Sequence, residues 1–158
     1  MKNLTVHPSS PKFLRGKWFA VLLVVFCFVI GCTSPREDQQ NVAVATKMFE
    51  AFNRHEWDSM AGYYADPAQF LDPSFGMEYV SKTRRETAAK YGEMAEMFPN
   101  IHDEVVGMYP SGDKVTVEFV STGTMGDTLS FKLPIVTVLT FKDGLIVRDA
   151  TYYDQENP

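Results

Sequence analysis

The sequence predicts an α+β fold in which helices pack on one face of a curved antiparallel sheet. Apolar residues recur at helical spacing in the part of the chain between residues 35 and 98, whereas the part from Ile101 to Tyr153 has the pattern of consecutive strands. Short segments rich in turn-forming residues separate these strands. Consecutive strands are therefore expected to pair as an antiparallel meander.

An apolar run over residues 18–30 precedes this fold and ends at Gly31-Cys32, with three basic residues between positions 12 and 17. A basic segment, a short apolar segment and a small-residue cleavage site are typical of a secretory signal. The run is shorter than the roughly 20 apolar residues that a membrane helix needs. The sequence around Cys32 resembles a bacterial lipobox, which implies that this cysteine is lipidated and becomes the first mature residue.

We therefore expect residues 1–31 to be a lipoprotein signal peptide, 32–38 the lipidated N-terminus and helix start, and 39–158 the folded domain. The alternative is an uncleaved membrane anchor in which Cys32 has no special role. By resemblance to lipoproteins, Thr33 after the cysteine implies the outer membrane of the bacterial cell envelope, if the host has one. Contact with the membrane is expected through the lipid anchor only.

The first helix is expected to begin almost at the lipid. Ser34, Pro35 and Glu37 have the positions of a capping box with proline as the first helical residue. Residues 53–55 are expected to end the helix. Its buried stripe is expected to contain Val42, Ala45, Phe49 and Phe52.

Two further helices and one short strand are expected before the meander. The second helix covers residues 57–64, and the strand covers residues 68–72. The third helix begins near Ser81 or Thr83, of which the latter opens a second capping box, and ends before Pro99.

The meander is expected to contain four strands. Asp143-Gly144 carries a strong signal for a two-residue hairpin before the last of them. The strands are expected at residues 101–109, 115–124, 129–141 and 145–153.

The charge balance and the few cysteines exclude several classes of function. Four of the 15 basic residues lie in residues 1–31, which leaves 11 against all 20 acidic residues, a net charge of −9. A domain this acidic is not expected to bind nucleic acid. With Cys27 and Cys32 as the two cysteines and His55 far from His102, no disulfide, metal site or cofactor is expected in the domain.

The order of elements and several local sequences resemble the nuclear transport factor 2-like superfamily, and the C-terminal part most resembles its SnoaL-like branch. This resemblance implies a cone-shaped fold, with three N-terminal helices on a curved sheet and an apolar pocket at the open end. The fold hosts isomerases, cyclases, hydrolases and non-catalytic binders, so it does not define a reaction. The matching segments are residues 49–53, 57–58, 63–68, 141–146 and 152–154.

Apolar and aromatic side chains on the expected elements are candidates for lining such a pocket, although most could equally be packed core. Met48 and Thr137 are included because they align with the oxyanion residues of ketosteroid isomerases in this superfamily. The candidate ligand-binding residues are Met48, Tyr64, Phe70, Tyr91, Phe98, Phe131, Thr137, Leu139 and Tyr152.

Asp72 is the candidate catalytic residue. It shares a strand face with Phe70, so it would enter the pocket if Phe70 does, and burial would then raise its pKa and suit it to general-base catalysis. The Asp72-Pro73 dipeptide resembles the one that carries the general base in ketosteroid isomerases. The alternative is that an aspartate before proline simply begins a turn.

The other active-site residues of ketosteroid isomerases, and the catalytic trio of limonene epoxide hydrolases from another branch, do not carry over to this chain. Met48 and Thr137 replace the oxyanion tyrosine and aspartic acid of the isomerases. The last-strand acid of limonene epoxide hydrolases would fall near Thr151. Strand alternation places Arg148 on one face and Asp149 with Thr151 on the other, and an ion pair is expected for Arg148.

The sequence thus predicts an envelope lipoprotein whose domain binds a small, largely apolar molecule and acts on it by proton transfer, as a lyase or isomerase. The alternative is a non-catalytic module that binds a ligand or a protein at the envelope. A homodimer through the outer face of the sheet is expected from the habit of the fold.

Overall fold

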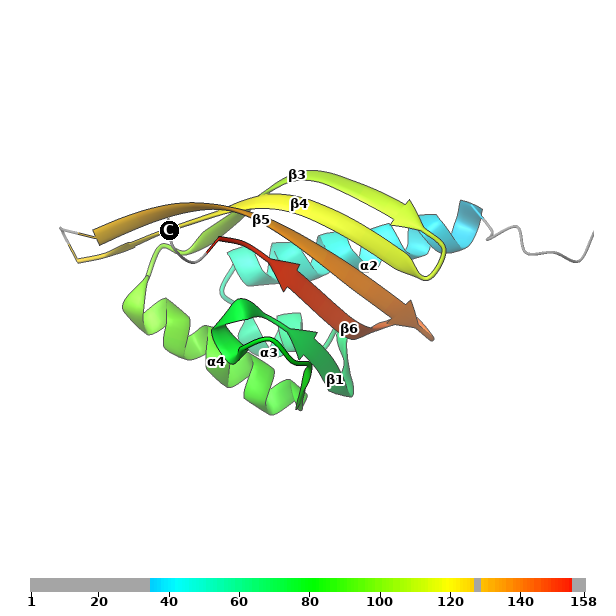
Figure 1. Ribbon diagram of the computed structural model, residues 1–158, viewed down its shortest axis with the longest axis horizontal. Helices are drawn as coiled ribbons and strands as arrows, with labels where there is room; N and C mark the ends of the chain where they lie inside the picture. Colours follow the sequence, from blue (N-terminus) through cyan, green and yellow to red (C-terminus); the bar gives the residue numbers. More distant parts are fainter. Residues whose placement is uncertain (1–34, 127–128, 155–158) are drawn as a thin grey trace, which may run out of the picture. The chain divides into compact units, whose positions relative to one another are not determined.

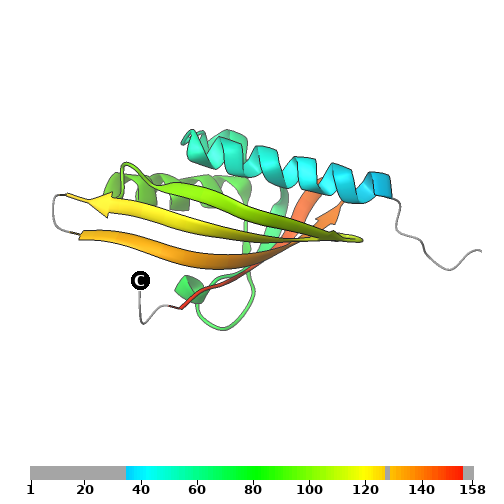
Figure 2. The same ribbon diagram turned by 90° about the horizontal axis from the view of Figure 1, so that it is seen from above.

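The computed structural model describes residues 35–126 and 129–154, and the signal peptide and Cys32 lie outside this part of the chain. The chain divides into two units, and the second, Thr33–Pro158, holds the fold described below. Its strands form one sheet in the order β2-β1-β6-β5-β4-β3. The helices all lie on the same face of this sheet (Figure 1, Figure 2).

Three α-helices are present in the described residues: α2 (Pro35–Asn53), α3 (Trp57–Ala61) and α4 (Arg84–Met97). Ala45, Phe49 and Phe52 form a buried stripe on α2, as the spacing predicts. Thr83 caps α4 in a capping box with Glu86, which decides between the two expected helix starts. Helix α3 is shorter than expected, because the chain is already extended at residue 64.

Six strands of the described residues build the sheet: the four predicted meander strands, the strand predicted at residues 68–72, and one that was not predicted. The meander strands β3 to β6 pair antiparallel in sequence order, as expected. Asp143 and Gly144 both have positive φ in the β5–β6 turn, which is the backbone of a type I′ hairpin. The strands are β1 (Tyr64–Leu71), β2 (Val80–Lys82), β3 (His102–Ser111), β4 (Lys114–Met125), β5 (Leu129–Lys142) and β6 (Leu145–Tyr152).

The expectation of a fully antiparallel sheet is wrong, because β1 pairs parallel to β6. Parallel neighbours need a crossover connection. The segment between β1 and β6, which contains α4 and most of the meander, provides it. The short strand β2, which the sequence did not indicate, pairs antiparallel with β1 through three residues. The parallel β1–β6 pair is the part of the sheet that positions the polar site.

The hydrophobic core lies between the helices and the sheet. Phe49 of α2 packs edge-on against Phe119 of β4, with ring centroids 5.0 Å apart. Tyr64, Val115, Val117, Leu139 and Ile146 are almost fully buried on the strands. Among the described residues, no helix is long and apolar enough to cross a membrane.

Candidate functional site

A cavity of about 430 Å³ lies between the helices and the sheet. Most of its wall is apolar and comes from α2, α4 and the strands β4 and β5. Aspartates, hydroxyls and one lysine supply its polar part. The apolar wall includes Met48, Phe49, Phe52, Met60, Met94, Phe98, Phe119, Phe131, Leu133 and Ile135, and the polar lining includes Tyr64, Asp72, Ser74, Lys90, Tyr91, Asp103, Ser121, Thr137, Asp149, Thr151 and Tyr153.

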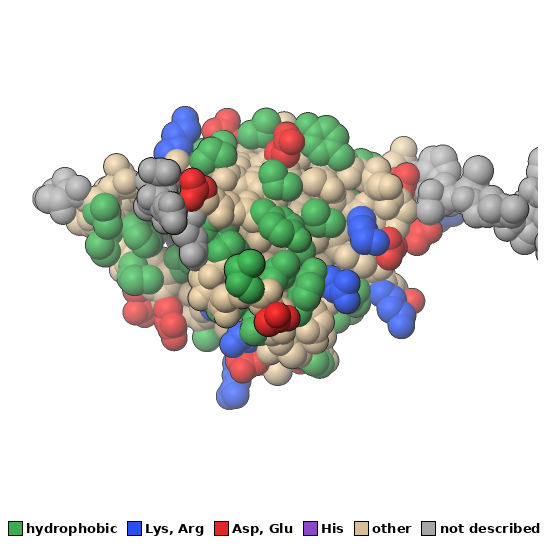
Figure 3. Space-filling model, in the orientation of Figure 1, with side chains coloured by type: hydrophobic (Ala, Val, Ile, Leu, Met, Phe, Trp, Pro, Cys, Tyr) green, Lys and Arg blue, Asp and Glu red, His purple; other side chains and the backbone are tan. Residues whose placement is uncertain are grey.

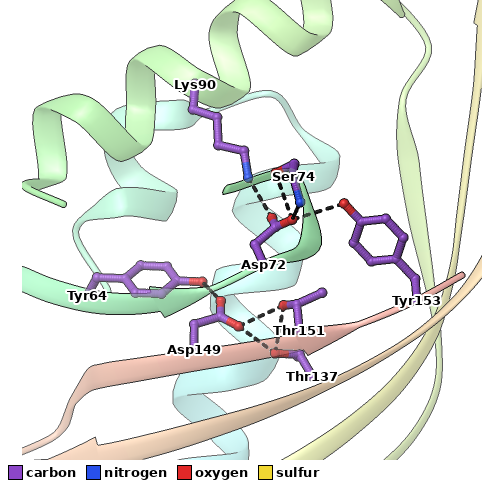
Figure 4. Close-up of polar contacts among 8 residues, drawn as sticks. All are labelled: Tyr64, Asp72, Ser74, Lys90, Thr137, Asp149, Thr151 and Tyr153. Carbon is purple, nitrogen blue, oxygen red and sulfur yellow. Dashed lines mark hydrogen bonds and ion pairs between the residues drawn. The ribbon is translucent and has the colours of Figure 1, made fainter. Parts of the chain in front are cut away.

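Asp149 of β6 is a buried carboxyl group in this cavity, with 7% of its surface exposed. Tyr64 of β1 donates a hydrogen bond to its Oδ2 across 2.8 Å. Thr137 of β5 and Thr151 of β6 both donate to its Oδ1 (Figure 4). The Asp149 carboxyl group is thus held by three hydroxyl groups, one from each of the neighbouring strands β1, β5 and β6.

Burial and hydrogen bonding act on Asp149 in opposite directions. Burial raises the pKa of the Asp149 carboxyl, and the hydroxyls of Thr137, Tyr64 and Thr151 together with the more distant Lys90 only partly offset this effect, so the pKa lies above its ordinary value. Burial also raises the pKa of the Tyr64 phenol well above 10. Asp149 therefore keeps its proton to a higher pH than an ordinary carboxyl group, while Tyr64 stays protonated and donates.

Asp72 follows β1 directly and has a different set of partners. Lys90 of α4 forms an ion pair with its Oδ2 at 2.7 Å. Tyr153 donates to its Oδ1 at 2.9 Å, and the Ser74 hydroxyl and backbone N–H donate to the same oxygen (Figure 4). Burial alone would raise the pKa of Asp72, but the Lys90 charge and the hydrogen bonds from Lys90 and Ser74 outweigh it and lower the pKa.

The expected upward shift in the pKa of Asp72 is therefore wrong, because Lys90, from a helix distant in the sequence, lies beside this carboxyl group. Both alternatives for its position hold in part. Asp72 lines the cavity, and it also caps the short 3₁₀ helix η2 (Pro73–Phe75) by accepting the Ser74 N–H. Asp72 is therefore an ionised carboxylate with partners on both oxygens, and it is not suited to act as a general base.

The register of the sheet brings the two carboxyl clusters together. Phe70 lies opposite Asp149 and Leu71 opposite Ala150 in the parallel β1–β6 pair, so Asp72 continues β1 beside Thr151. The charge of Lys90 acts on both Asp72 and Asp149. Two aspartates with oppositely shifted pKa values thus share one cavity, and such a division is typical of acid–base sites.

A third carboxyl group, Asp103 of β3, also lines the cavity and exposes 7% of its surface. Asn53 of α2 bonds its backbone N–H and C=O, each at 2.8 Å. Its side chain is less well satisfied, since Oδ1 is buried without a hydrogen-bond partner. Burial raises the pKa of Asp103 to about 6, an effect that the Ser121 hydroxyl opposes only in part.

Six of the nine candidate lining residues face the cavity: Met48, Tyr64, Tyr91, Phe98, Phe131 and Thr137. Leu139 is fully buried in the core instead. Phe70 packs on Tyr64 and faces a separate small pocket with Phe75. Tyr152 is 53% exposed on the outer face of the sheet, because strand alternation turns Tyr153 rather than Tyr152 inward.

Three charged residues of the cavity, Lys90, Asp103 and Asp149, were not proposed as site residues from the sequence. The alternation of β6 correctly put Asp149 and Thr151 on one face, but did not show that this face was the inner one. Asp103 shares a strand face with the buried Ile101, and this was the available signal. Lys90 carried no signal, and Arg148 lies over the Tyr79 ring at 4.9 Å rather than in the expected ion pair.

No cluster of three or more potential ligands for a metal ion is present among the described residues. The polar lining of the cavity supplies carboxyl groups, hydroxyls and one ammonium group. Such groups can bind polar atoms of a ligand and move protons.

The architecture and the interior polar site define a class of α+β domains that enclose a cavity between helices and a curved sheet. The SnoaL-like domain model matches residues 45–149, and the chain belongs to this family. The match contains the cavity-lining residues Met48 to Asp149. No protein of curated function matches the sequence at a significant level.

Solved structures share this fold at low sequence identity. A Catenulispora acidiphila protein with a ketosteroid isomerase-like fold, crystallised with trimethylamine, is 22% identical, with a TM-score of 0.63 over 71% of this chain and 85% of that one. An LEH-like epoxide hydrolase from M. tuberculosis is 16% identical, with a TM-score of 0.64 over 75% of this chain and 86% of that one. IdmH, a candidate polyketide cyclase from Streptomyces antibioticus, is 20% identical, with a TM-score of 0.66 over 75% and 94%.

Proposed function

We propose that this SnoaL-like domain binds a small, largely apolar molecule in its cavity and acts on it by proton transfer, as an isomerase or lyase. The observation that carries the proposal is Asp149: a buried carboxyl group with a raised pKa at an apolar cavity of about 430 Å³. This volume lies in the range of small-molecule sites. The role of general base passes from Asp72, where the sequence suggested it, to Asp149.

The proposed step begins with Asp149 as the carboxylate, held by Tyr64, Thr137 and Thr151. It takes a proton from a carbon next to a carbonyl group of the ligand, and the electron pair of the broken C–H bond moves onto the carbonyl oxygen. The neutral Asp149 then returns the proton to another carbon or to a leaving group. Lys90 has three N–H donors, so one can hold Asp72 while another binds the developing oxyanion.

Deuterium exchange tests this step without knowledge of the natural substrate. Residues 33–158 are incubated in D₂O with 2-tetralone, a small apolar ketone, and uptake of deuterium next to the carbonyl is followed by mass spectrometry. The wild-type domain should accelerate uptake, and Asp149→Asn should remove about 10²- to 10⁴-fold of that acceleration. Asp113→Asn, at an exposed ion pair with Lys114, is the charge-matched control.

A non-catalytic binder is the second candidate, and one observation favours it. Both oxygens of Asp149 already accept hydrogen bonds, and Asp72 is held by three side-chain partners. A carboxyl group with this many partners is suited to staying in place. Saturable binding of ketones with no acceleration of exchange in the wild type would favour this candidate over the enzyme.

We also propose that the domain is held at the bacterial cell envelope by lipid on Cys32, in the outer membrane where the host has one. The support is the order of basic residues, apolar run and Gly31-Cys32 in the sequence. Cys32→Ala should leave the precursor unprocessed or release the protein from the membrane fraction. Wild-type fractionation and migration of this variant would contradict the proposal.

A homodimer through the outer face of the sheet is proposed as well. Val136 of β5 and the opposite Tyr152 of β6 are exposed there, and Tyr79 adds a third exposed apolar side chain. Figure 3 views the molecule from the side opposite the helices, and hydrophobic side chains gather across that face. Sedimentation equilibrium of residues 33–158 tests it, and a monomer at high micromolar concentration would contradict it.

A further inference from the structure

Asp103 differs from the other two carboxyl groups of the cavity. Both side-chain oxygens of Asp72 and of Asp149 accept hydrogen bonds, whereas one oxygen of Asp103 does not. Its Oδ1 is the one buried side-chain nitrogen or oxygen without a hydrogen-bond partner among the residues that the structure describes. Leaving such a group unsatisfied costs about 1–3 kcal/mol. Asp103 also lines the cavity, so a ligand bound there is placed to supply the missing donor.

The structure around Asp103 holds the carboxyl group in this position. Asn53, at the end of α2, clamps the backbone of Asp103 on both its N–H and C=O groups. Ser121 lies directly opposite on β4 and also lines the cavity. The backbone of Asp103 is therefore held in place at the wall of the cavity.

The charge of the cavity indicates what kind of donor would suit this position. Asp72, Asp103 and Asp149 line it, and Lys90 is the one Lys or Arg among the described lining residues. Lys90 is already paired with Asp72 at 2.7 Å. The two remaining carboxyl groups thus have no cationic side chain of their own, and a cationic ligand is favoured over a neutral or anionic one.

Aromatic rings of the cavity wall add to this preference. Tyr64 and Tyr91 line the cavity together with Asp103. The Phe49–Phe119 pair also lines the cavity. Ring faces attract organic cations and form favourable contacts with an apolar ligand body.

We propose that the ligand of this cavity carries a protonated amine, whose N–H group binds Oδ1 of Asp103 while its apolar body contacts the aromatic wall. This inference rests on the proposed ligand-binding function and names the class of ligand. A charged hydrogen bond from an ammonium group satisfies the orphaned oxygen and neutralises the carboxylate in one contact.

Three probes that share one apolar body test the proposal: 1-naphthylmethylamine, 1-naphthylmethanol and 1-naphthoic acid. Their affinities for residues 33–158 are measured by isothermal titration calorimetry at pH 7.5. The amine should bind at least about 10-fold more tightly than the alcohol, and the acid should bind most weakly. In Asp103→Asn, the amine should lose at least about 10-fold in affinity, whereas the alcohol should change by less than about 2-fold.

Asp113→Asn is the matched control, because it removes one negative charge at an exposed site outside the cavity. It should leave all three affinities unchanged. Thermal unfolding checks that Asp103→Asn is folded, and binding of the alcohol by this variant reports an intact cavity.

The outcomes separate this inference from the proposed function. If the alcohol binds but the wild type does not prefer the amine, or if Asp103→Asn keeps the preference, the amine inference is wrong and ligand binding stands. If none of the three probes binds the wild type, the cavity is not a site for small aromatic ligands, and both proposals are wrong.

Discussion

Asp72 directly follows β1, Asp149 lies within the neighbouring strand β6, and both line the same cavity, yet their pKa values shift in opposite directions. Both are removed from water, and in both cases burial opposes ionisation. The difference lies in their partners, because Asp72 has the full charge of Lys90 at 2.7 Å while Asp149 has three neutral hydroxyls. A cation outweighs desolvation here, whereas three hydroxyls do not.

This comparison shows that depth in the cavity does not by itself make a base. Asp72, the residue with the family-like position before a proline, is fixed as an anion by its ion pair. The pKa of Asp149 lies above its ordinary value, because burial dominates and no positive charge lies as close to it as Lys90 lies to Asp72. Asp103 extends the comparison to a carboxyl group that has neither a cation nor a full set of donors.

The largest expected effect on stability is at Asp103. Its folded pKa of about 6, against an ordinary 3.8, means that the folded state binds the proton more tightly than the unfolded state. Its ionisation therefore opposes folding by up to about 3 kcal/mol above pH 6, and this cost disappears as the pH falls below 3.8. Asp103→Asn should stabilise the domain by up to that amount at pH 7 and leave it nearly unchanged at pH 3.5, measured by urea unfolding.

Equal stability of Asp103→Asn and the wild type at both pH values would contradict the buried, unsatisfied carboxylate. Asp113→Asn, at an exposed ion pair, should change stability by less than about 1 kcal/mol at either pH. This control separates burial at Asp103 from a general effect of net charge.

Asp72→Asn should have the opposite sign. The folded pKa of Asp72 is lowered, so its ionised form stabilises the fold above pH 3.8, and this contribution is lost as the pH falls through the folded pKa. The substitution leaves Lys90 without its anion and should destabilise the domain at pH 7 by about 1–3 kcal/mol. Urea unfolding at pH 7 and at pH 3 checks this, and the loss should be smaller at the lower pH.

Lys90→Met tests the Asp72–Lys90 ion pair from the side of the lysine. It removes the cation that lowers the pKa of Asp72, so the carboxyl group should then titrate at higher pH than in the wild type. A stabilising Asp72→Asn at pH 7 would mean that burial, rather than Lys90, dominates at this position.

The smallest expected effect is at Thr137, which donates to Oδ1 of Asp149. Thr137→Val keeps the shape of the side chain and removes a donor that favours the ionised carboxyl group. The pKa of Asp149 should rise further, and stability at pH 7 should fall by about 1 kcal/mol. Thr140→Val, on the outer face of the same strand, should alter neither quantity, and an unchanged pKa in Thr137→Val would contradict the assigned hydrogen bond.

Local signals predicted most of the fold, and they failed where pairing is non-local. The Thr83 capping box and the Asp143-Gly144 turn are written in a few neighbouring residues, so helix α4 and the β5–β6 hairpin could be predicted. The parallel pairing of β1 with β6 joins segments about 80 residues apart, and no local pattern encodes it. Strand β2 is held by three pairs to β1 and depends on that same non-local arrangement.

The candidate site, like the fold, could be predicted where the signal is local and not where it depends on contacts between distant segments. Strand alternation gave the correct relation between Asp149 and Thr151, but only the packing of helices on one face defines which face is inner. The resemblance to isomerases drew attention to Asp72, and it could not indicate that Lys90 of a distant helix neutralises this residue. Side-chain partners across elements decide which acid is the base, and these partners come from the tertiary structure.

The pKa of each cavity aspartate, measured by carboxyl ¹³C NMR and assigned with Asp72→Asn, Asp103→Asn and Asp149→Asn, tests the central claim most directly. Asp72 should titrate below 3.8, Asp103 near 6 and Asp149 above 3.8. If Asp149 titrates below 3.8 while Asp72 titrates above it, the assignment of Asp149 as the proton-transfer group is wrong and Asp72 takes its place.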